Sequence, residues 1–106
     1  MRKIIYNKLV RDRIPEIIER SGKTCETELL SSEAYLQMLD KKLDEELLEY
    51  HKDQNVEELA DLLEVIYAVV KARGYSIEEV DQVRVEKRKE RGGFDERILL
   101  KSVTEE

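Results

Sequence analysis

Two pairs of carboxylates stand three residues apart in segments of helical character: Glu46 and Glu49 in EELLE, and Glu58 and Asp61 in ELAD. Residues at this spacing lie on one face of a helix. The segment between the pairs, Asp53-Gln54-Asn55, has the composition of a turn and predicts an antiparallel helical hairpin. Pairing outward from that turn places Glu49 level with Glu58, and Glu46 level with Asp61.

Carboxylates that converge at one level repel one another unless cations join them. Carboxylate oxygens are the ligands that hard divalent ions prefer. The spacing therefore predicts a Mg²⁺ site whose ligands are Glu46, Glu49, Glu58 and Asp61. A second interpretation stays open on spacing alone, because charge-rich helices also place carboxylates three apart for capping or for ion pairs on a solvated face.

The elements that must position these residues form an all-α fold. Capping residues and three-to-four periodicity predict helices over about 12–21, 32–53, 55–74 and 76–92, in a single domain spanning residues 1–106. The apolar stripe of the 32–53 helix comprises Leu36, Leu39, Leu43, Leu47 and Tyr50. The terminal segments, about 3–10 and 98–100, are expected to be irregular or extended, with mutual pairing as one option.

The segment 55–74 carries more apolar surface than a simple amphipathic helix needs. From Leu62 onward, apolar residues occur around nearly the whole circumference of this helix, so we expect other helices to cover it on nearly all sides. A chain of 106 residues has little else with which to cover such a helix. We therefore expect a bundle of three to four helices that is completed by homodimerisation.

The last predicted helix has a row that begins apolar, with Ile77 and Val80, and ends cationic, with Arg84, Lys87 and Arg91. Antiparallel packing about Gly74 would place Lys87 and Arg91 beside the carboxylates. A phosphate ester held between metal ions and basic side chains would fit such a site.

Composition restricts the partners and the compartment. The net charge of −6 argues against a general nucleic-acid-binding role. Cys25 is the only cysteine, which favours a reducing cytoplasm, and the charged N-terminal segment has no signal-peptide core. The longest apolar run, 65–70, is too short to span a bilayer, so no membrane partner is expected.

EELLE followed by ELAD resembles the E-E-x-x-E … E-x-x-D signature of the MazG-like all-α nucleotide pyrophosphohydrolases. This superfamily includes phosphoribosyl-ATP pyrophosphohydrolase and the dimeric dUTPases. YNKLVRDRIPEII near the start and EKRKERGGFDERI near the end resemble a small MazG-related subfamily, so the resemblance covers most of the chain. The gap between Glu49 and Glu58 is shorter than in many members, and a short hairpin still permits the two pairs to meet.

The resemblance implies metal-dependent hydrolysis of a nucleoside triphosphate, between the α- and β-phosphates, to a monophosphate and pyrophosphate. It implies that the four carboxylates bind Mg²⁺, with Mn²⁺ as an alternative, and that one of them or Glu45 is the general base. The residues implied in substrate binding are Lys8, Arg11, Asp12, Lys87 and Arg91. Two other functions stay open, a noncatalytic nucleotide- or metal-binding regulator and a helical dimerisation module, as do the preferred base and the choice between dimer and tetramer.

Overall fold

The computed structural model describes residues 2–105, and within them the secondary structure consists of four helices without a strand. The helices are α1 (Ile14–Arg20), α2 (Ser32–Asp53), α3 (Val56–Ala72) and α4 (Ile77–Arg91). The predicted all-α fold with extended terminal segments is therefore confirmed. No helix in this range is both long enough and apolar enough to cross a membrane.

Side-chain caps explain why the three longer helices begin where they do. The Ser31 hydroxyl caps α2. The Asn55 side chain accepts a hydrogen bond of 3.0 Å from the backbone N–H of Glu58 at the start of α3. At the start of α4, Ser76 and Glu79 form a reciprocal capping box with hydrogen bonds of 3.0 and 3.3 Å. Such caps satisfy backbone donors that have no partner within the helix, so helix boundaries are encoded locally.

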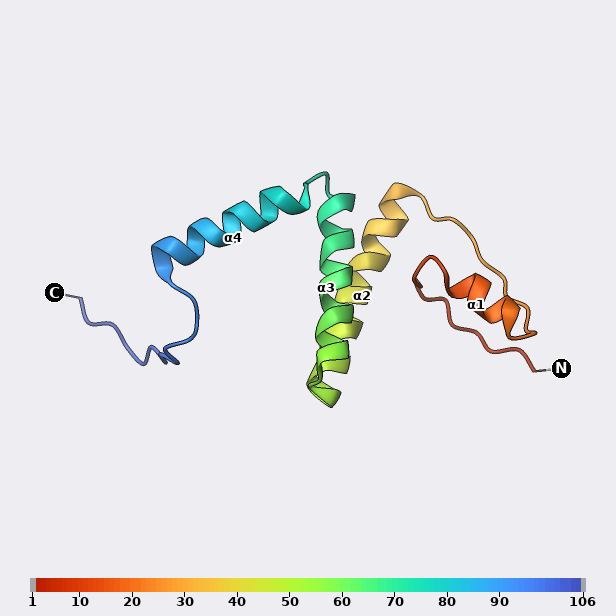
Figure 1. Ribbon diagram of the computed structural model, residues 1–106, viewed down its shortest axis with the longest axis horizontal. Helices are drawn as coiled ribbons and strands as arrows, with labels where there is room; N and C mark the ends of the chain where they lie inside the picture. The colour runs from red at the N-terminus through yellow and green to blue at the C-terminus, as the bar shows by residue number, and fades with distance from the viewer. Residues whose placement is uncertain (1, 106) are drawn as a thin grey trace.

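Helices α2 and α3 pack side by side as an antiparallel hairpin at the centre of the molecule (Figure 1). The chain reverses at Gln54, which adopts the left-handed conformation with φ of 50°. The buried apolar residues are Leu39 of α2, which is 2% exposed, and Val70 of α3, which is 8% exposed. This small core lies toward the end of the hairpin that is distant from the turn.

Helix α4 does not return along α3. It leaves the end of α3 at a steep angle and runs away from the hairpin, so the two helices touch only near their junction (Figure 1). The predicted antiparallel packing of α4 on α3 is thus wrong within one chain. Apolar residues occur mainly in the first half of α4, where Ile77, Val80 and Val83 lie, and the charged second half has no stripe that could hold it along α3.

The two terminal segments lie at opposite ends of the longest axis of the molecule, which measures 70 × 31 × 24 Å (Figure 1). The suggested pairing of residues 98–100 with the N-terminal segment is therefore not formed within one chain. Both segments are extended and expose apolar side chains, including Ile5 and Leu99. A single copy of the chain thus consists of a packed hairpin with loosely attached elements on either side.

Candidate metal centre

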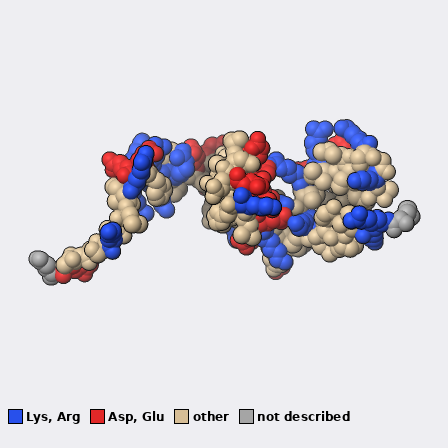
Figure 2. Space-filling model, turned by 90° about the horizontal axis from the view of Figure 1, so that it is seen from below, with Lys and Arg blue, Asp and Glu red and all other residues tan. Residues whose placement is uncertain are grey.

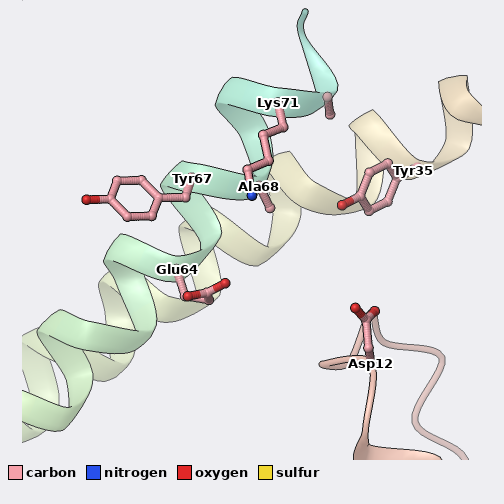
Figure 3. A pocket seen from close by; sticks show the side chains of 7 residues that line it. Asp12, Tyr35, Glu64, Tyr67, Ala68 and Lys71 are labelled. Carbon is pink, nitrogen blue, oxygen red and sulfur yellow. The ribbon is translucent and has the colours of Figure 1, made fainter. Parts of the chain in front are cut away.

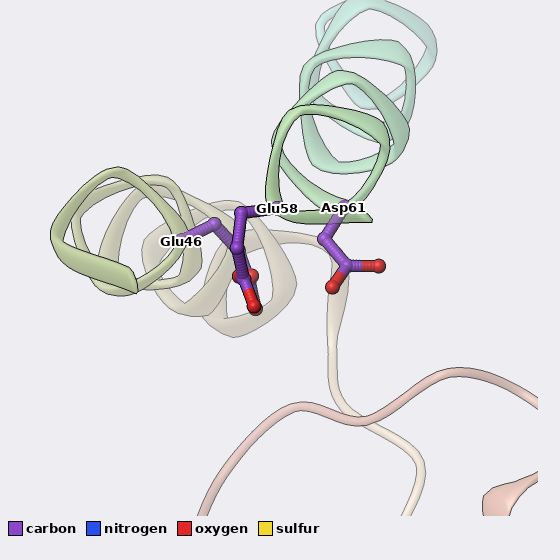
Figure 4. Close-up of side chains that lie close together, drawn as sticks. All are labelled: Glu46, Glu58 and Asp61. Carbon is purple, nitrogen blue, oxygen red and sulfur yellow. The ribbon is translucent and has the colours of Figure 1, made fainter. Parts of the chain in front are cut away.

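Three carboxylates converge on one side of the hairpin near its turn. Glu46 of α2 and Glu58 and Asp61 of α3 each offer an oxygen atom, and these atoms lie within 4.8 Å of one another. All three residues are half-buried, and the carboxyl groups point to the side on which the N-terminal segment passes (Figure 4). The three-residue spacing on α3 and the short turn explain this convergence, because both keep the side chains on the same face.

Glu58 also belongs to a second cluster. Its carboxylate, that of Glu49 and that of Asp53 offer oxygen atoms within 4.8 Å of one another. Glu49 therefore lies beside Glu58, and Glu46 beside Asp61, as counting outward from the turn predicts. Asp53 was missed because it was assigned only to the turn, although its position four residues after Glu49 puts both on one face of α2.

The carboxylates influence one another electrostatically at Glu58. Partial burial of this side chain raises its pKa above the ordinary value, and the neighbouring charges of Asp61, Glu49, Asp53 and Glu46 raise the pKa further. Each of these effects disfavours the ionised form of Glu58. A cation placed among the carboxylates would remove this penalty, since it would compensate the negative charges that converge there.

Lysine side chains neutralise the outer part of the cluster. Lys42 Nζ lies 3.5 Å from a carboxylate oxygen of Glu46 and 3.5 Å from one of Glu45. The Lys8 ammonium lies 3.2 Å from the same Glu45 oxygen. Glu45, a candidate base, belongs to neither carboxylate cluster and lies next to the two lysine ammonium groups. Lys42 was not singled out from the sequence, although its position four residues before Glu46 is a usual spacing for an ion pair.

The N-terminal segment crosses the hairpin beside the acidic clusters. Arg11 donates a hydrogen bond of 2.7 Å from its guanidinium to Asp61, fifty residues away in sequence. Arg11 therefore contacts a predicted metal ligand, whereas Lys8 contacts Glu45, which neighbours Glu46 in sequence but lies outside both clusters. Both ion pairs are open to solvent, so they add little stability and can be exchanged for other ligands.

Asp12 lines a pocket of about 570 Å³ (Figure 3). Glu64, which also lines this pocket, follows Asp61 by about one turn of α3. The pocket is lined by Asp12, Tyr35, Glu64, Tyr67, Ala68, Lys71 and Ala72. In Figure 3, Tyr35 and Glu64 border the space facing Asp12, whereas Tyr67 projects away from it. A pocket of this size suits a small molecule. Sequence reasoning had not assigned an aromatic pocket, because the two tyrosines come from different helices.

The remaining predicted substrate-binding residues, Lys87 and Arg91, are not brought to the carboxylates within one chain. Both are exposed on the second half of α4, and within residues 2–105 neither makes an ion pair. Seen from the side of the hairpin turn, carboxylates gather over the hairpin, and basic side chains lie on both flanks (Figure 2). The molecule therefore separates much of its positive charge from the acidic clusters.

The chemistry of the donor set fits Mg²⁺ or Mn²⁺. Both clusters consist of carboxylates carried by helices, without a histidine or thiol among them. Oxygen donors of this kind select hard divalent ions over the softer ions that bind nitrogen and sulfur. Because α2 and α3 pack against each other, they hold these carboxylates rigidly, as a small ion requires. The residues present are therefore suited to Mg²⁺ or Mn²⁺.

Comparisons with known proteins do not indicate an activity for this site. No family model matches the chain, and no solved structure matches it. An uncharacterized protein of Mycolicibacterium smegmatis is 55% identical over 42 residues, which cover 40% of this chain. The chain spans 43% of the length of that relative, for which no activity is stated.

Proposed function

We propose that this protein is a Mg²⁺-dependent nucleotide pyrophosphohydrolase of the MazG-like class, active as a homodimer or higher homo-oligomer. The observation that carries the proposal is the pair of carboxylate clusters that share Glu58, with Arg11 and Lys8 beside them. Carboxylates that hold metal ions next to cationic side chains form a site suited to a polyphosphate. The resemblance of EELLE and ELAD to the superfamily signature agrees with this chemistry.

In this proposal Glu46, Glu49, Glu58 and Asp61 hold Mg²⁺, for which Mn²⁺ can substitute. The bound ion supplies positive charge to the phosphates, whose own charge repels an attacking water. One of these four carboxylates or Glu45, which lies outside both clusters, takes a proton from that water. Hydrolysis then breaks the phosphoanhydride between the α- and β-phosphates, which yields a nucleoside monophosphate and pyrophosphate.

The other side chains bind the substrate. Lys8 and Arg11 can exchange their exposed carboxylate partners for phosphate oxygens, because the charge on a guanidinium or ammonium suits either anion. In this proposal the nucleoside of the same molecule occupies the pocket between Asp12 and Tyr35, whose lining includes Glu64, about one helical turn after Asp61. Its aromatic ring and its carboxylates provide a stacking surface and hydrogen-bond acceptors for a base with amino or imino groups.

Release of pyrophosphate tests the proposal directly. The substrates are natural and modified ribo- and deoxyribonucleoside triphosphates and phosphoribosyl-ATP, each with Mg²⁺ and with EDTA. We expect metal-dependent release that falls by about 100-fold or more in Glu46→Gln, as for removal of a group that supports transition-state charge. The matched control is Glu57→Gln, an exposed carboxylate outside both clusters, which should retain activity. A folded protein without release from any substrate would contradict the enzymatic proposal.

Thermal unfolding provides a second readout that needs no turnover. Mg²⁺ with a nonhydrolysable triphosphate should raise the melting temperature, because a ligand that binds only the folded state stabilises it. Asp61→Asn should abolish the rise, whereas the exposed Asp44→Asn should preserve it. A rise without pyrophosphate release would favour the noncatalytic regulator, and the absence of both would favour the dimerisation module.

A further inference from the structure

The pocket beside the N-terminal segment is lined by charged side chains that have no ionic partner in the protein. Asp12, Glu64 and Lys71 line this pocket, and none of the three forms an ion pair within residues 2–105. By contrast, the guanidinium of Arg11, the preceding residue, lies 2.7 Å from Asp61. The hydrogen-bonding capacity of the pocket is therefore available to a ligand.

The signs of these charges restrict the ligand. The two carboxylates accept hydrogen bonds, and the ammonium group of Lys71 donates them. A simple cation would be repelled by Lys71, and a phosphate would meet two carboxylates. A neutral polar ligand that offers at least two donors and one acceptor satisfies all three groups. The half-buried ring of Tyr35 also borders the pocket (Figure 3), so a flat aromatic ligand has a surface on which to pack.

The outer edge of guanine offers this combination of groups. Its N1–H and its N2 amino group are two adjacent donors, and the acceptor O6 lies next to them. Adenine and cytosine place an acceptor nitrogen beside their amino group, whereas uracil and thymine have one N–H between two carbonyl groups. Against a carboxylate, these acceptors would bring lone pairs together and leave a polar group without a partner. A site built for hydrogen bonds rejects such analogues strongly.

The place of the pocket in the fold agrees with a nucleotide that reaches the carboxylate clusters. Glu64 follows Asp61, a member of one cluster, by about one turn of α3. Asp12 follows Arg11, whose guanidinium contacts the same Asp61. Both carboxylates of the pocket are thus connected through the backbone to the ion pair at the edge of the cluster.

We propose that this pocket makes the protein selective for guanine nucleotides. Asp12 and Glu64 accept hydrogen bonds from N1–H and the N2 amino group, Lys71 donates to O6, and the base packs on Tyr35. The placement of the phosphates at the carboxylate clusters rests on the proposed function, whereas the preference for guanine rests on the charged groups of the pocket.

Binding of nucleoside monophosphates tests the preference without hydrolysis. Guanosine, inosine and adenosine monophosphates are titrated with Mg²⁺, and the methyl resonances of Ala68 and Ala72, which line the pocket, are followed by NMR. We expect guanosine monophosphate to shift both resonances. The inosine compound, which lacks the N2 amino group, should bind about 10-fold or more weakly, because a hydrogen bond to a charged acceptor is lost. Equal affinities, or no shift with the guanosine compound, would overturn the inference.

Variants assign the preference to the pocket. Asp12→Asn and Lys71→Gln should each weaken binding of guanosine monophosphate by about 10-fold, because each replaces a charged hydrogen-bonding partner. The matched controls are the exposed residues Asp44→Asn and Lys89→Gln, which lie outside the pocket and should bind as the wild type does. Unchanged binding in both pocket variants would overturn the assignment.

Kinetics separate this inference from the proposed function. Among the triphosphates of guanosine, inosine, adenosine, cytidine and uridine, we expect the guanosine compound to give the highest kcat/KM for pyrophosphate release, by about 10-fold or more. Pyrophosphate release at equal kcat/KM from all five would support the proposed activity and overturn the preference for guanine. Selective binding of guanosine monophosphate without pyrophosphate release from any triphosphate would support the preference and contradict the proposed activity.

Discussion

The α2–α3 hairpin and α4 show how differently two helical regions of one chain depend on their surroundings. The hairpin has apolar residues along the facing sides of both helices, and a short turn holds those sides together. Helix α4 is equally well capped, yet its apolar residues end after about half its length, and it stands apart from α3. A side-chain cap therefore determines where a helix begins, whereas its place in the fold depends on a continuous apolar stripe.

The two regions also divide the chemistry of the proposed site. The hairpin gathers carboxylates from two helices, whose oxygen atoms lie within 4.8 Å of one another. The second half of α4 carries Lys87, Arg88, Lys89 and Arg91, interspersed with Glu86 and Glu90, at a distance from those carboxylates. The turn of two residues between α2 and α3 can bring carboxylates together, because it fixes the register of one helix against the next. Lys87 and Arg91 on α4 do not reach those carboxylates within one copy of the chain, because α4 contacts α3 only near their junction.

Alanine substitutions in the hairpin core and in the C-terminal segment should differ most in their effect on the free energy of unfolding. Leu39→Ala should lower the free energy of unfolding by about 2–5 kcal/mol, because it removes a buried side chain and leaves a cavity. Leu100→Ala, at a position that is 74% exposed, should change the free energy of unfolding by less than about 0.5 kcal/mol. Urea denaturation of both variants measures the contrast. Equal losses would show that the C-terminal segment is as firmly packed as the hairpin.

Removal of one helix cap each from α3 and α4 should have a smaller effect on stability and shows whether the two helices unfold together. Asn55→Ala and Ser76→Ala each remove a side-chain cap, and each should lower the free energy of unfolding by about 1 kcal/mol. The loss at Ser76 should appear in the global transition, because α4 contacts α3 at their junction and is expected to unfold together with the hairpin. Circular dichroism during urea denaturation is the measurement. A reduced helix content with an unmoved transition in Ser76→Ala would indicate that α4 folds independently of the rest.

The smallest expected effect is a pH dependence that originates at Glu58. Its raised pKa means that the folded protein binds a proton more tightly than the unfolded chain does. Without metal, its contribution to stability is therefore present below the ordinary glutamate pKa and is lost as pH rises through the raised pKa. The stabilisation by Mg²⁺ should grow over the same range, because the metal binds the ionised carboxylate.

Melting temperatures in EDTA and in Mg²⁺ across this pH range measure both trends. Glu58→Gln preserves the backbone N–H that Asn55 caps and removes the titrating group, so it serves as the control. The difference between wild type and Glu58→Gln isolates this residue from the other titrating groups. A pH profile that is identical in the two proteins would exclude Glu58 as the origin of the effect.

The sequence was sufficient to predict the helices and which carboxylates of α2 lie beside which carboxylates of α3, because both depend on residues that are close in sequence. Asn55 and the capping box at Ser76 define the starts of α3 and α4 locally, and helical periodicity then assigns each side chain to a face. A turn of two residues between α2 and α3 leaves little freedom of register. The positions of Glu46 beside Asp61 and of Glu49 beside Glu58 follow from these local facts.

Only the tertiary structure decided how distant segments meet. The Arg11–Asp61 ion pair joins residues fifty positions apart, and Tyr35 of α2 and Glu64 of α3 border one pocket from two helices. The direction of α4 was equally inaccessible, because charge patterns are compatible with contact within one chain or between two. Local propensity determines which helices form, whereas the balance of apolar burial and chain entropy over the whole molecule determines where they pack.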